Sequence, residues 1–105
     1  MRSLIEGYDE LEKKLGYEPD FHDDHIEKVT VTSDRIKFDL KTEDEILYSL
    51  IFEDVKEMHL EGEIDNMAGI IFGLEIKQKD EMLKTDIDAS VGICGEIISK
   101  RIIVK

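Results

Sequence analysis

The chain has 105 residues and carries 14 Lys and Arg side chains against 26 Asp and Glu, which gives a formal net charge of −12. That length is typical of one domain, so we expect residues 1–105 to fold as a single domain. The negative charge argues against binding to bare nucleic acid or to an anionic membrane, because both would repel the protein.

The content of core-forming residues predicts a folded chain. Ile, Val, Leu and Phe account for 33 of 105 residues, well above the share of about one fifth below which chains are typically disordered. The one cysteine, Cys94, allows no internal disulfide, which is typical of a reducing compartment. The N-terminus does not resemble a secretory signal and no run of 18 apolar residues occurs, so the sequence predicts a cytoplasmic protein.

The first predicted element is a helix over residues 3–15. Ser3 followed by Glu6 fits a capping box at its start, and Gly16 and Pro19 are stop signals at its end. Spacings of four, three and four residues place four apolar side chains on one helix face; these are Leu4, Tyr8, Leu11 and Leu15.

Beyond the helix, the hydrophobic period changes to that of β-strands. Alternation of apolar and polar residues predicts a hairpin with strands at 29–31 and 36–40 around a turn at 33–34. A further turn is expected at 42–44. Residues 45–52 carry apolar side chains on both faces, which is typical of a central strand covered on both sides.

The second half of the chain shows the same strand pattern. Further strands are expected at 58–60, 70–76, 83–89 and 97–104, the last after a loop at 92–95. In the second of these, alternation places one set of apolar residues on the same face: Ile70, Phe72, Leu74 and Ile76. Short strands without helices between them predict an α+β, mainly β fold, with an N-terminal helix followed by six or seven mostly antiparallel strands in a sheet or a sandwich.

The densest polar cluster is the segment His22-Asp23-Asp24-His25. Imidazole and carboxylate groups are common ligands of zinc, iron and manganese. Successive residues of an extended chain point to opposite faces, so a metal site would need a further ligand such as His59. A metal-dependent hydrolase is therefore one hypothesis. The simpler interpretation is that these side chains bond the exposed amides of a loop, and we predict no metal and no cofactor.

The sequence provides little support for nucleophilic catalysis. Cys94 lies in a largely apolar stretch, where a lone cysteine usually fills space. Ser90 and Ser99 are in no nucleophile elbow, and the segment 92–95 is too short for a phosphate-binding loop. We therefore predict that the protein is not an enzyme.

Negative charge is concentrated in two windows. Residues 18–27 carry −5 and residues 43–65 carry −8. These windows are either solvated turns and edges, which charge protects from unwanted pairing, or a surface that attracts a basic protein. On the second interpretation the predicted partner-binding residues are Glu18, Asp20, Phe21, His22, Asp23, Asp24, Glu43, Asp44, Glu45, Glu53, Asp54, Glu57, Glu61 and Glu63.

Residues 16–24 carry a motif, Gly-Tyr-Glu-Pro-Asp-Phe-His-Asp-Asp. It resembles the G-x-x-P-x-F-H-D opening of the immunity protein 50 family, small bacterial proteins encoded beside polymorphic toxins. The resemblance continues through 51–60 and 70–76 and covers the chain from about residue 11 onward. After the His-Asp pair the family pattern has a small and then an acidic residue, where this chain has Asp24 and His25.

The resemblance implies a protein that inactivates a cognate toxin by binding it, without catalysis, and marks His22 and Asp23 as motif positions. Together with the acidic windows it predicts an immunity-type protein whose partner is a toxin domain with a basic surface. The alternatives are the metal-dependent hydrolase and a stand-alone β-rich protein-interaction module. The sequence is also compatible with a homodimer formed through an edge strand.

Overall fold

The computed structural model describes residues 2–62 and 69–105. It has a short 3₁₀ helix, one α-helix and six strands, so the predicted α+β, mainly β class is confirmed. The elements are η1 (Arg2–Leu4), α1 (Tyr8–Leu15), β1 (His25–Val31), β2 (Arg35–Lys41), β3 (Leu47–Glu61), β4 (Gly69–Lys79), β5 (Met82–Val91) and β6 (Cys94–Val104).

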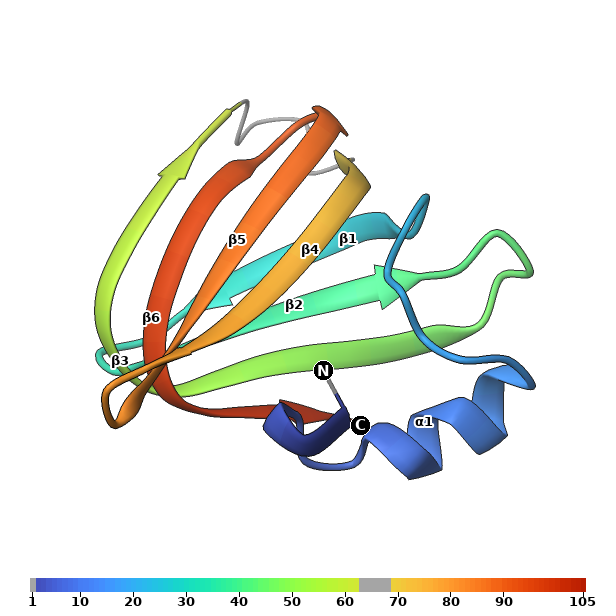
Figure 1. Ribbon diagram of the computed structural model, residues 1–105. Coiled ribbons are helices and arrows are strands. Elements are labelled where there is room, and N and C mark those ends of the chain that lie inside the picture. The colour runs from blue at the N-terminus through green and yellow to red at the C-terminus, as the bar shows by residue number, and fades with distance from the viewer. Residues whose placement is uncertain (1, 63–68) are drawn as a thin grey trace.

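The six strands form one sheet, in the order β1-β2-β3-β6-β5-β4, which closes into a barrel where β1 pairs with β4. All neighbouring strands are antiparallel. Among the described residues the closing pair is short: His25 and Ile26 of β1 pair with Ile70 and Gly69 of β4. The sequence left a sheet or a sandwich open, and the structure is a single sheet that curves back on itself (Figure 1).

The N-terminal helix is shorter than the predicted one, and its capping box is absent. Gly7, at φ +83°, precedes α1 and no side chain caps the helix. The predicted pairing of Ser3 with Glu6 is wrong because residue 6 joins the sheet instead. The amide of Glu6 donates to the carbonyl of Ile102 at 2.8 Å, and the amide of Val104 donates to the carbonyl of Glu6 at 2.8 Å.

One long strand replaces two predicted ones. The expected strands at 45–52 and 58–60 both lie in β3, whose pairing with β6 shifts register between Val55 and Glu57. Such a bulge bends and twists a strand. β3 pairs with β2 over its first half and with β6 from Leu50 to Glu61. The expected covering of 45–52 on both faces fails at Leu47, which is 62% exposed.

The last strand starts earlier than predicted. Cys94 and Gly95, expected in a loop, already pair with Glu61 and Leu60 of β3. The glycine permits this start, because its φ of +148° is a conformation that side chains rarely adopt. Cys94 is a free thiol of intermediate exposure, rather than the buried space-filling residue that its apolar neighbours indicated.

The core fills the barrel and one of its ends. α1 lies along the end at which β3 and the C-terminus of β6 meet (Figure 1), and its apolar face is buried as the periodicity predicts. Within the barrel, the rings of Phe38 and Phe52 meet edge to face with centroids 5.8 Å apart. Burial of each such side chain stabilises the fold by about 1.5–3 kcal/mol. The core cluster includes Tyr8, Leu11, Leu15, Phe21, Ile26, Phe38, Leu40, Leu50, Phe52, Ile71, Ile97 and Ile102.

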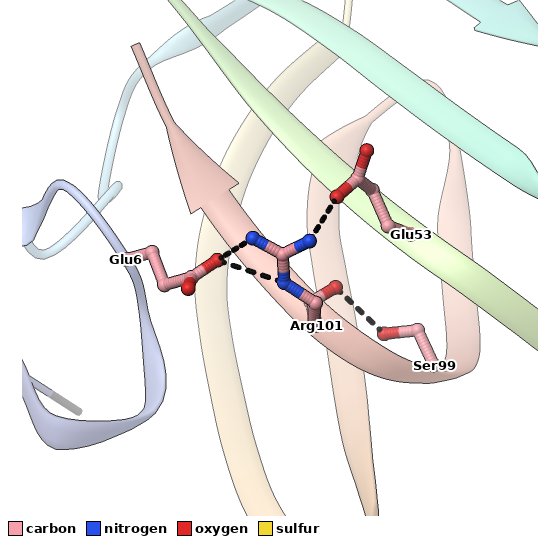
Figure 2. A network of polar contacts seen from close by, with 4 residues as sticks. All are labelled: Glu6, Glu53, Ser99 and Arg101. Atoms are coloured by element: carbon pink, nitrogen blue, oxygen red, sulfur yellow. Dashed lines mark hydrogen bonds and ion pairs between the residues drawn. The ribbon is translucent and has the colours of Figure 1, made fainter.

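A network of polar contacts joins the N-terminal segment to the barrel (Figure 2). The Nε and Nη2 atoms of Arg101 donate to Oε2 of Glu6 at 3.0 and 2.7 Å, and its Nη1 atom lies 3.1 Å from Oε1 of Glu53. The hydroxyl of Ser99 donates to the Arg101 carbonyl at 3.4 Å. Arg101 thus links three segments that are distant in sequence.

We expect Arg101→Ala to loosen the N-terminal segment without unfolding the barrel. The guanidinium is exposed, so solvent weakens its ion pairs, and the Glu6 amide should exchange its hydrogen at most about fivefold faster, the upper range for exposed pairs. Hydrogen exchange followed by NMR measures this. Lys100→Ala, which removes the same charge one residue earlier, is the control. An unchanged exchange rate for the Glu6 amide in Arg101→Ala would contradict the prediction.

Candidate functional site

Two loops meet at one end of the barrel. The α1–β1 segment, residues 16–24, and the β2–β3 turn, residues 42–46, lie side by side there (Figure 1). The negative charge of Glu43 in the turn acts on both His22 and Asp24 of the α1–β1 segment. The two acidic windows of the sequence therefore converge in part. Both segments carry solvent-accessible carboxylates, and the four called the acidic end below are Asp20, Asp23, Glu43 and Asp44; Glu18 and Glu45 are also exposed in these segments.

The backbone of the α1–β1 segment turns sharply around His22. Phe21 and Asp23 both adopt left-handed conformations, with φ of +64° and +65°, which is rare for a bulky side chain such as phenylalanine. Oδ1 of Asp20 accepts the His22 amide at 3.0 Å, and the carbonyl of Ile71 accepts the Asp23 amide at 2.7 Å. These bonds tie the segment to β4 and leave His22 on the surface.

Two of the predicted binding residues instead form part of the interior. Phe21 is 1% exposed and its ring lies 6.2 Å from that of Tyr48. Asp24 is 6% exposed and accepts a short hydrogen bond from the Tyr48 hydroxyl. Burial raises the pKa of Asp24, the Tyr48 hydrogen bond opposes that rise, and the charges of Asp20 and Glu43 add to it. Both residues position the loop rather than present their side chains to a partner.

His22 lies against an exposed aromatic side chain, that of Phe72, which the sequence pattern places on one strand face with Ile70, Leu74 and Ile76. Its ring meets Phe72 edge to face with centroids 5.6 Å apart, and Nδ1 lies 2.5 Å from the Phe72 carbonyl oxygen. Nε2 is 3.4 Å from Oδ2 of Asp23. The hydrogen bond to the Phe72 carbonyl, followed by the charge of Asp23, raises the pKa of the exposed His22 imidazole above its ordinary value.

A β-bulge explains why Phe72 points outward. In the pairing of β4 with β5, Ile71 lies opposite Ala89 and Gly73 lies opposite Asp88, so Phe72 is an extra residue. Bulges re-aim side chains and interrupt the alternation of a strand, and Phe72 is 59% exposed as a result. The prediction that Phe72 shares a face with Leu74 is therefore wrong. The neighbouring Gly73 was the available signal, since a glycine within a strand often marks a bulge.

Tyr17 adds a second exposed aromatic ring to the same end. It is 43% exposed, and burial of its hydroxyl, with the charges of Asp24 and Asp44, raises the pKa of the phenol. These influences place the Tyr17 phenol, which belongs to the α1–β1 segment, close to the β2–β3 turn. Exposed aromatic side chains bordered by charged groups are typical of protein-binding surfaces.

The remaining predicted residues do not join the acidic end. Glu53 pairs with Arg101, and Asp54 lines with it a surface groove of about 260 Å³. Glu57 is exposed on β3. Glu61 lines a groove of about 440 Å³ that also contains His59, Asp86, Asp88, Cys94 and Glu96.

Three predicted residues complete the set. Glu18 is exposed and accepts a hydrogen bond from the Tyr8 hydroxyl at 3.3 Å. Glu45 is an exposed turn residue with φ of +66°. Glu63 lies outside the described residues.

The proposed metal ligands do not converge. His22 bonds the Phe72 carbonyl, Asp24 bonds Tyr48, and His59 lines the groove beside β6. Across residues 2–62 and 69–105, no group of three or more His, Cys, Asp or Glu side chains is arranged to hold a metal ion. Within the same part of the chain, no helix has the length and apolarity needed to span a lipid bilayer.

Comparison with known proteins identifies the fold but not a family. No family model and no curated protein matches the sequence. A solved structure described as an uncharacterized protein from Neisseria gonorrhoeae is similar in fold, with a TM-score of 0.63 and 12% sequence identity. The match covers 81% of this chain and 92% of the other. At that identity the likeness shows that the two chains share a fold, and no more.

Proposed function

We propose that the protein is an immunity-type inhibitor, which binds and neutralises a cognate bacterial toxin domain without catalysis. The observation that carries the proposal is the convergence of the acidic end with two exposed aromatic rings. Asp20, Asp23, Glu43 and Asp44 surround this region, and Tyr17 and Phe72 are exposed within it. The motif that resembles the immunity protein 50 family, residues 16–24, forms half of this surface.

The composition of this surface fits a protein partner with basic side chains. Carboxylates attract such a partner over a distance and accelerate the encounter. Aromatic side chains then supply much of the binding energy at the centre of an interface, inside a polar rim. Leu47, the exposed first residue of β3, directly follows the β2–β3 turn, and its carbonyl accepts a hydrogen bond from the Lys14 ammonium of α1 at 2.6 Å.

Co-expression with the gene that neighbours its own, whose product the proposal takes to be the toxin, tests the proposal directly. We expect the protein to restore growth of cells that express the toxin and to form a complex with it on gel filtration. Unchanged killing together with no complex would refute the proposal. Binding to other basic proteins, without protection from the toxin, would instead indicate the stand-alone interaction module.

Neutralising the acidic end is expected to slow complex formation. The quadruple variant Asp20→Asn, Asp23→Asn, Glu43→Gln and Asp44→Asn keeps side-chain size, and Asn tolerates the left-handed conformation of residue 23. Because electrostatic steering changes association rates by 10-fold or more, we expect an association rate constant at least about tenfold lower at low salt. Surface-based binding kinetics at two ionic strengths measures this.

The matched control removes the same number of charges elsewhere. Glu57→Gln, Glu61→Gln, Asp80→Asn and Glu81→Gln lie on β3 and at the β4–β5 turn. We expect this variant to retain most of the wild-type association rate, since its charges lie away from the acidic end. Equal slowing of the two quadruple variants would show that net charge acts as a whole and would contradict a localised contact.

A further inference from the structure

The side chain of Phe72 is 59% exposed to solvent. The bulge in β4 turns the side chain out of the barrel, while Phe21, Phe38 and Phe52 fill the interior. Its backbone carbonyl bonds His22, and the imidazole meets the ring in a T-shaped arrangement with centroids 5.6 Å apart. The ring is therefore held against His22 while more than half of the residue stays open to solvent.

The charges around His22, whose imidazole contacts the Phe72 ring, come from both loops. Asp23 lies 3.4 Å from Nε2 of His22, and the charges of Asp20 and Glu43 also act on that imidazole. Within the described part of the chain, these three carboxylates make no ion pair with a lysine or arginine; the one ion-pair contact is that of Asp23 with His22. Among the described residues, His22 is therefore the one cation that compensates the negative charge near the exposed Phe72 ring.

We infer that the exposed ring of Phe72, together with Asp20, Asp23 and Glu43 around the adjoining His22, is the binding site for an arginine side chain of the protein partner. The inference rests on the proposed function and names the contact by which the partner is held. A guanidinium is weakly hydrated, stacks on an aromatic face and donates two parallel hydrogen bonds to a carboxylate. Lysine is a strongly hydrated point charge and fits this combination less well.

Occupation of the site is coupled to the charge of His22. A protonated imidazole puts a positive charge beside the ring, where it repels an incoming guanidinium. The groups that face His22 are Asp20, Asp23, Glu43 and the Phe72 carbonyl, and together they favour its protonated form. By linkage, arginine binding must lower the His22 pKa as much as protonation weakens arginine binding. Binding should therefore strengthen as pH rises through the His22 pKa.

A short peptide, acetyl-Gly-Arg-Gly-amide, is the probe, and NMR detects its binding to the intact protein. We expect saturable shifts of the Phe72 ring and His22 imidazole signals and a lower His22 pKa in the presence of the peptide. The matching peptide with citrulline, which has the same shape without the charge, should bind at least about tenfold more weakly. A third peptide carries lysine in place of arginine. Binding of the citrulline peptide or of the lysine peptide that equals binding of the arginine peptide would overturn the assignment to arginine.

Two variants locate the contact. Phe72→Leu should weaken binding of the arginine peptide at least about tenfold, whereas Met58→Leu, at another exposed apolar position on β3, should leave it unchanged. His22→Gln should remove the pH dependence and retain binding. Wild-type affinity in Phe72→Leu would overturn the inference, as would unchanged pH dependence in His22→Gln.

The experiments distinguish a failure of the inference from a failure of the proposed function. If the protein neutralises its toxin but the arginine peptide shifts no signal of Phe72 or His22, the proposed function stands and the inference fails. If the peptide binds at Phe72 but no toxin complex forms, the inference stands and the proposed function fails. Concentration-dependent dimerisation that Phe72→Leu abolishes would identify a second copy as the occupant and would overturn the arginine assignment.

Discussion

Gly95→Ala is expected to lower the free energy of unfolding by at least about 3 kcal/mol. Gly95 lies near the start of β6 with φ of +148°, and a Cβ atom there would overlap the carbonyl oxygen of His59. It would also lie 2.9 Å from the Cα atom of Leu60. All of these are backbone atoms of β3, so no side-chain rotation relieves the clash, and the two strands must separate.

Urea denaturation of Gly95→Ala and of a matched variant measures this effect. Gly73→Ala is the control, since a Cβ atom at residue 73 would meet nothing within 4 Å and Gly73 has no positive φ. Alanine there should change stability by less than about 1 kcal/mol, with a contribution from the lower entropy of the unfolded chain. Similar midpoints for the two variants would show that β3 and β6 do not approach each other as closely as described.

Tyr48→Phe is expected to lower the free energy of unfolding at pH 7 by about 1.5–3 kcal/mol, the range for a hydrogen bond to a charged group. The variant removes the hydroxyl that donates to Asp24, a residue 6% exposed. The Asp24 carboxylate would then be buried without this donor, which lowers the free energy of unfolding more than the loss of a neutral hydrogen bond does. Tyr17→Phe, at an exposed tyrosine, is the control and should change stability little.

The same pair predicts a pH dependence with a defined sign. Burial raises the pKa of Asp24 above its ordinary value of 3.8, so the folded state binds this proton more tightly than the unfolded state. The stability that Asp24 contributes is therefore fully present below pH 3.8 and is lost as pH rises through the higher pKa of the folded state. Because Tyr48 favours the ionised form, the deficit of Tyr48→Phe should grow over the same range.

The free energy of unfolding of a variant that cannot ionise at residue 24 is subtracted from that of the wild type. The difference separates the effect of Asp24 from the repulsion among the other acidic residues. Asp24→Asn keeps an oxygen that accepts from Tyr48, and its stability should fall less than that of the wild type as pH rises from 3 to 7. Denaturation curves at several pH values give the difference. A difference that does not vary with pH would show that Asp24 has the same pKa in the folded and unfolded states.

Local patterns predicted most of the elements correctly. The apolar face of α1 and the β1–β2 hairpin follow from spacing and turn residues, because neighbours in sequence decide them. The errors arose where contacts between distant segments decide the conformation. Glu6 hydrogen-bonds the backbone of β6 rather than capping a helix, and the bulge at Phe72 interrupts an alternation that the sequence showed as regular.

The candidate site was predictable in part. His22, Asp23 and the charge of residues 43–45 were found from composition and motif, yet no local pattern shows that the α1–β1 segment and the β2–β3 turn lie side by side. The sequence pattern does not distinguish the buried Phe21 and Asp24 from their accessible neighbours, because their burial depends on contacts with Tyr48 of the distant strand β3. Phe72 was assigned to the wrong face for the same reason, since its orientation depends on pairing with β5.

The sequence by itself determined the net charge of −12, the strand-forming periodicity and the positions of most turns, since each depends on residue identity or on near neighbours. Only the tertiary structure decided that one sheet closes on itself and that part of the two acidic windows meets at one end. Both depend on pairing between strands that are far apart in the chain. Closure of the barrel therefore brings some of the carboxylates that make up the net charge to the end that carries two exposed aromatic rings.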